Sequence, residues 1–213
     1  MMNHEDRKAL AAQTVAELKK SYPDAICSLT YKNPIQLLIA VRLSAQCTDA
    51  RVNKVTPVLF EKYPTLESLC EATAEDIGEI IKPCGLFNTK ARDIRNLALM
   101  IRDEYGGTVP DSMEQLLRLP GVGRKTANLI LGDVYGKPAI VADTHCIRIS
   151  GRIGLTDGTK DPVKVERQLR ECVKPSEGNN LCHRFVLFGR ETCTARSPKC
   201  GKCPLGSFCL KHI

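Results

Sequence analysis

Apolar residues recur at intervals of three and four along most of this chain, a spacing that places them on one face of an α-helix. No run of alternating polar and apolar residues bounded by hairpin turns interrupts this pattern, so we expect an all-α fold. One helix should begin after Thr48 or Asp49, and another should contain Leu116 to Leu119. The other predicted helices span residues 5–20, 34–45, 65–72, 74–82, 88–105, 124–135, 144–153, 162–173 and 180–191.

Start and stop signals support these boundaries. Asn33-Pro34 and Asp161-Pro162 each combine a capping side chain with a proline that suits the first helical position. Gly106-Gly107 is typical of a helix C-terminus, where a left-handed residue is favoured. Asp111 and Glu114 have the spacing of a capping box before the next apolar run.

Length, charge and hydropathy narrow the class of protein. The chain has 213 residues, enough for one large domain or two small ones, and 43% of its residues are hydrophobic. No apolar run reaches the roughly 18 residues that a membrane helix needs, and the first residues lack the apolar stretch of a signal peptide. We therefore expect a protein of the cytoplasm or nucleoid. Its net charge of +7 favours an anionic partner such as nucleic acid.

The chain contains 11 cysteines but no export signal, which argues against a disulfide framework. Seven of them stand singly among apolar residues, so we interpret them as small buried hydrophobic side chains. These seven are Cys27, Cys47, Cys70, Cys84, Cys146, Cys172 and Cys182.

The other four cysteines are close together in the sequence, with the spacing C-x6-C-x2-C-x5-C. They are Cys193, Cys200, Cys203 and Cys209. Four thiolates in one short loop repel each other unless a metal centre neutralises them, and both zinc and an iron–sulfur cluster suit thiolate ligands. The same loop carries Arg196, Lys199 and Lys202, which indicates a surface that meets an anion.

A glycine-containing hairpin, Leu119–Ala127, joins two predicted helices. Pro120 prevents continuation of the first helix, whereas Gly121 and Gly123 permit positive φ and leave room for a close ligand. The second helix starts at once, so its first N–H groups and Arg124 can bind a phosphate. The alternative is a tight turn between helices in which the glycines have no ligand.

Lys125 and Asp143 suggest chemistry only when they are considered together. Alone, Lys125 suits a solvated charge or a phosphate contact, and Asp143 suits a helix N-cap. Together they supply an amine nucleophile and a carboxylate. The carboxylate can accept the amine's proton and then stabilise positive charge on a sugar ring, as glycosidic cleavage requires.

Five segments resemble the endonuclease III family, the bifunctional DNA glycosylases of the helix-hairpin-helix superfamily, and they follow one another along the chain in the order that the family has. They are LPGVGRKTA (119–127), VADTH (141–145), the cysteine loop, and the segments Leu43–Asp49 and Gly85–Ala91. The resemblance covers about residues 30–210. It implies two helical domains: residues 28–138 would form a six-helix domain containing the hairpin, and residues 1–27 with 139–213 would form a cluster domain. The active site would lie in the cleft between them.

The resemblance also implies a cofactor and a mechanism. A [4Fe–4S] cluster would be held by the four clustered cysteines, which makes zinc the weaker alternative. The enzyme would bind duplex DNA that contains damaged bases or abasic sites and turn the damaged nucleotide out of the stack. Lys125 would attack C1′, displace an oxidised pyrimidine and form a Schiff base. Strand cleavage by β-elimination would follow, with Asp143 accepting a proton.

Further DNA contacts follow from the same motifs. Gln46 matches the residue that fills the gap left by the flipped nucleotide, and Leu86 matches the apolar wedge, although a core leucine is the simpler interpretation. His145 could contact phosphate or orient the helix of Asp143. The remaining predicted DNA contacts are Gly121, Val122, Gly123, Arg124, Arg196 and Lys199.

Three alternatives remain open from the sequence. A mismatch-specific adenine glycosylase would lack the lysine nucleophile, whereas a pyrimidine-dimer glycosylase would share it. A non-catalytic iron–sulfur DNA-binding protein would not need the Lys125/Asp143 pair. The family default is a monomer, and the preferred lesion is not encoded in any of these motifs.

Overall fold

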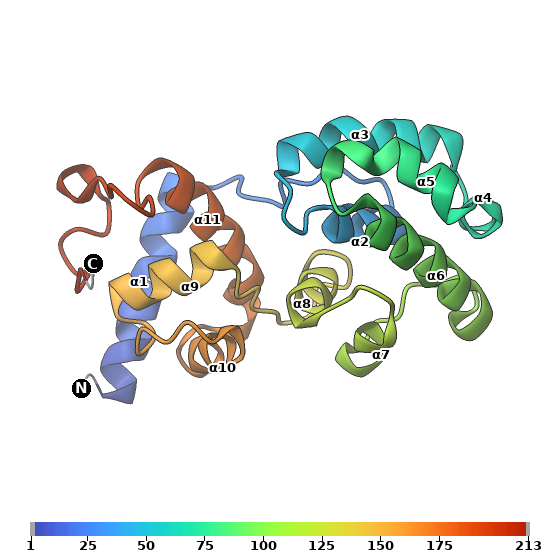
Figure 1. Ribbon diagram of the computed structural model, residues 1–213. Coiled ribbons are helices and arrows are strands. Elements are labelled where there is room, and N and C mark those ends of the chain that lie inside the picture. The colour runs from blue at the N-terminus through green and yellow to red at the C-terminus, as the bar shows by residue number, and fades with distance from the viewer. Residues whose placement is uncertain (1–2, 212–213) are drawn as a thin grey trace. The chain divides into compact units, whose positions relative to one another are not determined.

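The structure, a computed structural model, describes residues 3–211, and all the regular secondary structure in that range is helical (Figure 1). Its helices confirm the all-α prediction. They are α1 (His4–Ser21), α2 (Pro34–Leu43), α3 (Asp49–Lys62), α4 (Leu66–Glu71), α5 (Ala74–Ile81), α6 (Phe87–Tyr105), α7 (Met113–Arg118), α8 (Arg124–Asp133), α9 (Thr144–Ile153), α10 (Pro162–Cys172) and α11 (Gly178–Glu191). Short 3-10 turns occur at Lys82–Cys84, Pro175–Glu177 and Cys200–Lys202. None of the described helices has the length and apolar character needed to cross a membrane.

Most helices begin where a polar side chain caps them. The Asn33 side chain accepts a hydrogen bond from the Gln36 N–H at 2.9 Å. Several helix ends differ from the sequence prediction by one or two residues, and two of the differences have a clear local cause. α2 ends at Leu43 rather than Ala45, because Gln46 has a φ of 54° that a right-handed helix cannot contain. α7 is capped by Ser112, not by Asp111, through a hydrogen bond from the Gln115 N–H.

The chain divides into two compact units. The continuous unit comprises Cys27–Tyr135, and the discontinuous unit comprises Met1–Ile26 with Gly136–Ile213. The two domains expected from the sequence, residues 28–138 and residues 1–27 with 139–213, stay a prediction.

In the continuous unit, α2 supplies the centre of the core. Its residues Leu37, Leu38, Ile39 and Ala40 are fully buried, so the helix is apolar on every side. It contacts α3, α6 and α8, while α4 and α5 pack against α6. Because α2 contacts both α6 and α8, three loops lie near it: the loop after α2, the loop before α6 and the loop before α8.

In the discontinuous unit, α1 packs against α10 and α11, and α9 packs against α11. The core contains Leu18, Phe185 and Phe188, all at most 1% exposed. The Tyr22 ring meets the Phe188 ring edge to face, with 6.4 Å between centroids. Helix α11 therefore anchors both the N-terminal helix and the helix that follows Asp143.

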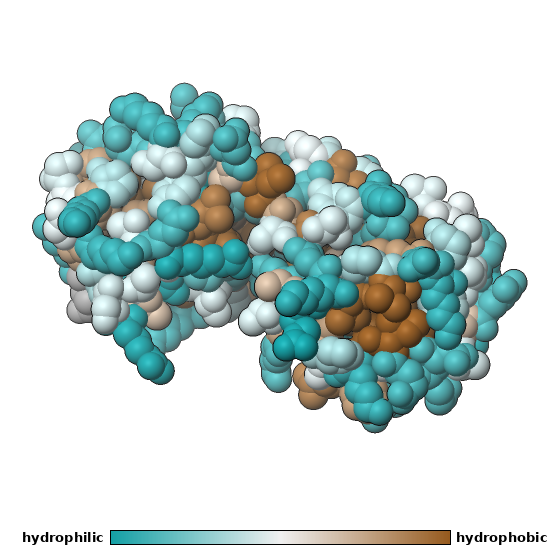
Figure 2. Space-filling model, turned by 90° about the horizontal axis from the view of Figure 1, so that it is seen from above, coloured by the Kyte–Doolittle hydropathy of each residue, from teal (hydrophilic) through white to brown (hydrophobic). Residues whose placement is uncertain are grey.

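Hydrophilic residues cover most of the face seen in Figure 2, with apolar areas between them. Among the described residues, six large apolar side chains are exposed: Ile26, Val58, Leu86, Leu117, Val163 and Leu210. Scattered apolar exposure is ordinary for a protein surface. Leu86 differs from the others because its backbone is also left-handed, with a φ of 51°.

Candidate functional site

The hairpin between α7 and α8 needs glycine at position 121, the first of its two glycines. Gly121 has a φ of 72°, and a Cβ placed there would lie 2.5 Å from Nε of Arg42 and 2.8 Å from Oδ2 of Asp93. Two features of the folded protein therefore require glycine here, and neither involves a ligand. The backbone is left-handed, and the Arg42–Asp93 ion pair lies directly against it. The hairpin closes with a hydrogen bond from the Val122 N–H to the Leu119 carbonyl, and the Val122 side chain is buried.

Gly123 behaves differently, because it does not use the positive φ that a glycine permits. Its φ is −99° and its ψ is 177°, an extended conformation open to any residue. It is the N-cap of α8 and supplies no side-chain cap, and a Cβ built there would meet no atom within 4 Å. The space beside Gly123 at the start of α8 is therefore open, and an anion that binds a helix N-terminus needs such space.

Arg124 and Lys125 are the first two residues of α8, and both side chains are exposed. Lys125 thus projects from the first turn of the helix, next to the open space at Gly123. An exposed amine at this place can reach a ligand whose phosphate is held by the hairpin. The Lys125 side chain is exposed and does not contribute to the core of the described part of the chain.

Gln46 and Leu86 are two of the three non-glycine residues within 3–211 that have positive φ, at 54° and 51°. Both side chains are exposed, with Leu86 at 56%. Left-handed backbone is unfavourable for such residues and persists only where the surrounding structure enforces it. Strained, exposed residues of this kind concentrate at functional sites.

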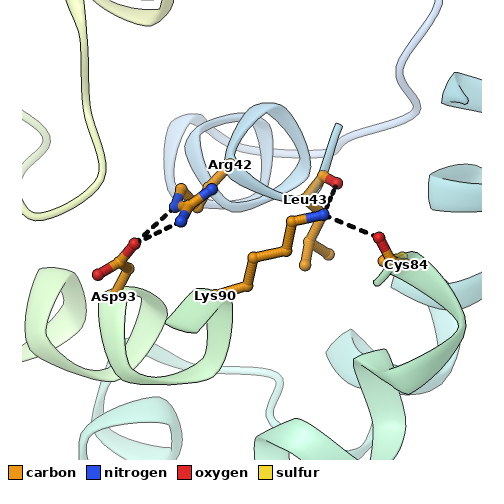
Figure 3. Close-up of polar contacts among 5 residues, drawn as sticks. All are labelled: Arg42, Leu43, Cys84, Lys90 and Asp93. Atoms are coloured by element: carbon orange, nitrogen blue, oxygen red, sulfur yellow. Dashed lines mark hydrogen bonds and ion pairs between the residues drawn. The ribbon is translucent and has the colours of Figure 1, made fainter. Parts of the chain in front are cut away.

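Sequence reasoning missed the polar contacts beneath these loops (Figure 3). Arg42 donates to Asp93 Oδ2 from Nε at 2.7 Å and from Nη2 at 2.6 Å, and both side chains are mostly buried. Close by, Lys90 is fully buried and donates to two backbone carbonyls. No local pattern distinguishes these side chains from surface charges, since Asp93 lies 51 residues from Arg42 and Leu43 lies 47 residues from Lys90.

In the discontinuous unit, Asp143 is the N-cap of α9. Its Oδ1 accepts a hydrogen bond from the Cys146 N–H at 2.7 Å, and the residue is half-buried. The capping role that the sequence offers as the simpler interpretation is therefore present. Among residues 3–211 this hydrogen bond engages Oδ1 and leaves Oδ2 for another partner.

His145 is the second residue of α9 and packs closely against α11. A Cβ at Gly189 would lie 2.4 Å from its Nδ1, and Arg148 Nη2 is 3.2 Å from the same nitrogen. Arg148 also donates to the carbonyls of Gly189 and Cys193, which ties α9 to α11 and to the start of the cysteine loop. Arg148 was not predicted. Its spacing of four residues from Thr144 and Arg152 was the available signal, since it places all three on one helix face.

The four clustered cysteines line one hollow, together with Phe188, Leu205 and the aliphatic parts of neighbouring side chains. No three His, Cys, Asp or Glu side chains in the described part of the chain are arranged to hold a single metal ion. Burial raises the pKa of the Cys203 and Cys209 thiols, and negative charge on the other cysteines of the loop raises it further. Without a cation beside them, the Cys203 and Cys209 sulfurs therefore disfavour their thiolate forms.

Donors around this hollow suit sulfur atoms that carry negative charge. Arg152 Nη1 donates to Cys193 Sγ at 3.5 Å, and the Lys211 N–H donates to Cys209 Sγ at 3.4 Å. Arg152 also holds the Thr194 and Ala195 carbonyls at 2.7 and 2.8 Å, which fixes the first part of the loop. Four thiols in one hollow with N–H donors directed at sulfur fit an iron–sulfur cluster. Arg196, Lys199 and Lys202 are exposed on the same loop.

Family models match two parts of the chain. Residues 39–175 match the HhH-GPD superfamily of base excision DNA repair proteins, and residues 193–209 match the iron–sulfur binding domain of endonuclease III. The second match begins at Cys193 and ends at Cys209, the first and last of the clustered cysteines. The cofactor of this chain is accordingly a [4Fe–4S] cluster.

Similar proteins cover nearly the whole chain. Endonuclease III of Synechocystis is 45% identical over 204 residues, which is 95% of this chain and 93% of the relative. Endonuclease III of Escherichia coli is 38% identical over 203 residues, 95% of each chain.

Solved structures agree with these relatives. A non-covalent endonuclease III–DNA complex matches with a TM-score of 0.91 and 42% identity, covering 99% of this chain and 97% of the other. A trapped endonuclease III–DNA covalent intermediate matches with a TM-score of 0.90 over the same shares. With its motifs, its helical fold and its cysteine loop all in agreement, this chain belongs to the endonuclease III family within the HhH-GPD superfamily of base excision DNA repair proteins.

Proposed function

We propose that this protein is a DNA glycosylase that removes oxidised pyrimidines from duplex DNA and cleaves the resulting abasic site by β-elimination, with Lys125 as the nucleophile. The observation that supports this most directly is the exposed Lys125 amine in the first turn of α8, beside an N-cap that lacks a side chain. Membership of the endonuclease III family supports the class of reaction.

The chemistry begins with a neutral amine. Lys125 Nζ forms a bond to C1′ of the deoxyribose while the bond between C1′ and the base nitrogen breaks, and the base leaves with a proton. Opening of the sugar ring converts the adduct into a Schiff base. Loss of a proton from C2′ then expels the 3′ phosphate, and water hydrolyses the Schiff base to free Lys125.

Asp143 has the complementary role in this proposal. Its carboxylate takes the proton from the Lys125 amine and offsets the positive charge that develops on the sugar. The hydrogen bond from the Cys146 N–H fixes the carboxylate through Oδ1. Oδ2 is then the oxygen that serves the reaction. We propose that Asp143 and Lys125 act on the same nucleotide.

We assign DNA binding to five segments. The hairpin Gly121–Arg124 would hold a backbone phosphate with the first N–H groups of α8. The exposed Gln46 and Leu86 would fill the place of the flipped nucleotide and open the stack. His145, Arg196 and Lys199 would contact phosphates from the discontinuous unit. Arg196 and Lys199 are exposed, whereas the His145 ring is half-buried against α11, which leaves it the weaker candidate.

The cluster would be held by Cys193, Cys200, Cys203 and Cys209, each binding one iron. When bound, it supplies a rigid, charge-neutralising core to a loop that has few apolar residues of its own. The chain's contribution is to present Arg196 and Lys199 at fixed positions on that loop. We further propose that the protein works as a monomer on chromosomal DNA in the cytoplasm, which light scattering after size-exclusion chromatography and cell fractionation would test.

Lys125→Ala is the decisive variant, and exposed Lys54 of α3, changed to Ala, is its matched control. Oligonucleotides with thymine glycol or an abasic site would be incubated with each protein and reduced with borohydride. Lys54→Ala should yield the covalent adduct, whereas Lys125→Ala should yield none and lose at least about a thousandfold in single-turnover excision, the scale of a lost nucleophile. DNA affinity should largely persist.

The same assay separates the alternatives. An adduct formed only on a cyclobutane pyrimidine dimer would indicate a dimer-specific glycosylase. DNA binding with no adduct on any substrate would indicate a protein without catalysis. Full excision by Lys125→Ala would show that the nucleophile has been misassigned.

A further inference from the structure

Lys90 is fully buried, at 0% exposure. Its Nζ donates to the Leu43 carbonyl and to the Cys84 carbonyl, each at 2.8 Å (Figure 3). Burial lowers the pKa of this ammonium, so the site is a costly one for a charge. A buried lysine is retained where its hydrogen bonds do something that an apolar side chain could not.

The two acceptors occupy equivalent positions in the fold. Leu43 is the last residue of α2, and Cys84 is the last residue of the 3-10 turn before α6. Carbonyls at helix C-termini lack partners within the helix, and a cation there is favourable. One ammonium group therefore caps two helical segments that are far apart in the sequence.

Each capped segment leads directly into a strained loop. Three residues after Leu43 is Gln46 with a φ of 54°, and two residues after Cys84 is Leu86 with a φ of 51°. The Lys90 backbone N–H also donates to the Leu86 carbonyl at 3.0 Å, as the first turn of α6 requires, so the two ammonium contacts are what lysine adds at this position. Backbone strain of this kind needs a surrounding structure that enforces it, and Lys90 provides common support for both loops.

The neighbouring ion pair extends this support to the hairpin. Arg42 precedes Leu43 on α2, and Asp93 lies one turn after Lys90 on α6, so two polar contacts join the same pair of helices (Figure 3). Gly121 lies against that ion pair. The α2–α6 contact thus underlies the three segments of the continuous unit that are assigned to DNA.

We propose that Lys90 is a positioning residue that holds Gln46 and Leu86 in one fixed arrangement, so that both side chains enter the duplex together during nucleotide extrusion. This inference rests on the proposed function of the two loops. Lys90 does not touch the reacting atoms. Its loss should slow the extrusion of a paired nucleotide and spare the later chemistry.

The test compares one lesion in two settings. Thymine glycol would be placed in a fully paired duplex, where extrusion is required, and in a bubble of unpaired bases, where extrusion costs little. Lys90→Met should lose roughly tenfold to a hundredfold in single-turnover excision from the duplex, the range expected for a misplaced group. Excision from the bubble should change by less than about threefold on the same scale. A 2-aminopurine opposite the lesion should show less unstacking when the variant binds.

Leu97→Ala is the matched control, because Leu97 is fully buried on the same helix but touches neither loop through a polar contact. It should lower stability and reduce both rates in equal proportion. Lys90→Gln, which keeps a donor group, should lie between wild type and Lys90→Met. In the Leu86→Ala background, Lys90→Met should cost less than it does alone, since part of what it positions is gone.

Equal losses of the excision rate on duplex and bubble would overturn the proposal. Failure of both Lys90 variants to fold would also overturn it, because Lys90 would then act through stability alone. Absence of excision by the wild-type protein on both substrates would instead count against the proposed function. The two failures are thus distinguishable.

Discussion

Replacing Gly121 by alanine tests the hairpin most directly, because two separate costs can be worked out from the structure. The φ of 72° places an alanine in left-handed backbone, which costs about 1–2 kcal/mol. The new Cβ would also lie 2.5 Å from Arg42 Nε and 2.8 Å from Asp93 Oδ2, so the ion pair must move. Hydrogen bonds between charged groups contribute about 1.5–3 kcal/mol, and these side chains are only 13% and 23% exposed.

A smaller effect opposes these costs. Alanine restricts the unfolded chain more than glycine does, which stabilises the folded state by about 0.4–1 kcal/mol. We therefore expect Gly121→Ala to lower the free energy of unfolding by about 2–4 kcal/mol. Urea denaturation followed by circular dichroism would measure the change.

Gly123→Ala is the control within the same hairpin. Its backbone is extended and its Cβ would meet no atom within 4 Å, so the loss of stability should stay below about 1 kcal/mol. Its added methyl group would instead stand at the open N-terminus of α8, where we place a DNA phosphate, and should weaken DNA binding. Similar stability losses for the two variants would refute the argument from φ and contact, and unchanged DNA affinity in Gly123→Ala would refute the placement of the phosphate.

Three further predictions concern the packing and the thiols. Gly189→Ala should destabilise the protein by about 2 kcal/mol, measured by urea denaturation, because its Cβ would lie 2.4 Å from His145 Nδ1; a change within error would contradict this packing. Arg148→Met should release the cluster faster in the presence of a chelator, seen as decay of visible iron–sulfur absorbance, because the hydrogen bond to the Cys193 carbonyl is lost; equal decay would argue against that role. Burial raises the pKa of Cys27 to about 12. The unfolded thiol ionises from about pH 8.5, so stability should fall as the pH rises from there toward 12, and Cys27→Ala should remove part of that slope; identical slopes would contradict it.

Local signals explain why so many helix ends were predictable. Asn33-Pro34 and Asp161-Pro162 act through neighbouring residues, and the structure places both helices where these pairs predict. Where two local signals overlap, the sequence cannot choose between them. Asp111 with Glu114 and Ser112 with Gln115 both satisfy the capping-box pattern, and the structure uses Ser112.

The site shows the same division between local and distant causes. The cysteine loop was evident because its four thiols are adjacent in sequence and line one hollow. Lys90 was not evident, since its partner Leu43 is 47 residues away and nothing near Lys90 indicates burial. The two glycines of the hairpin look alike in the sequence, yet only Gly121 faces a side chain from another helix.

The discontinuous unit is built from two separate segments of the chain, and this has a consequence for synthesis on the ribosome. Helix α1 emerges before the continuous unit, but the helices it packs against, α10 and α11, are made only after that whole unit. The buried face of α1, which includes Leu10, Ala11 and Leu18, must therefore wait in the nascent chain without its partners. During that interval the continuous unit already has every residue of its own core, so translation order favours its folding first and leaves α1 as the segment that most needs protection by chaperones.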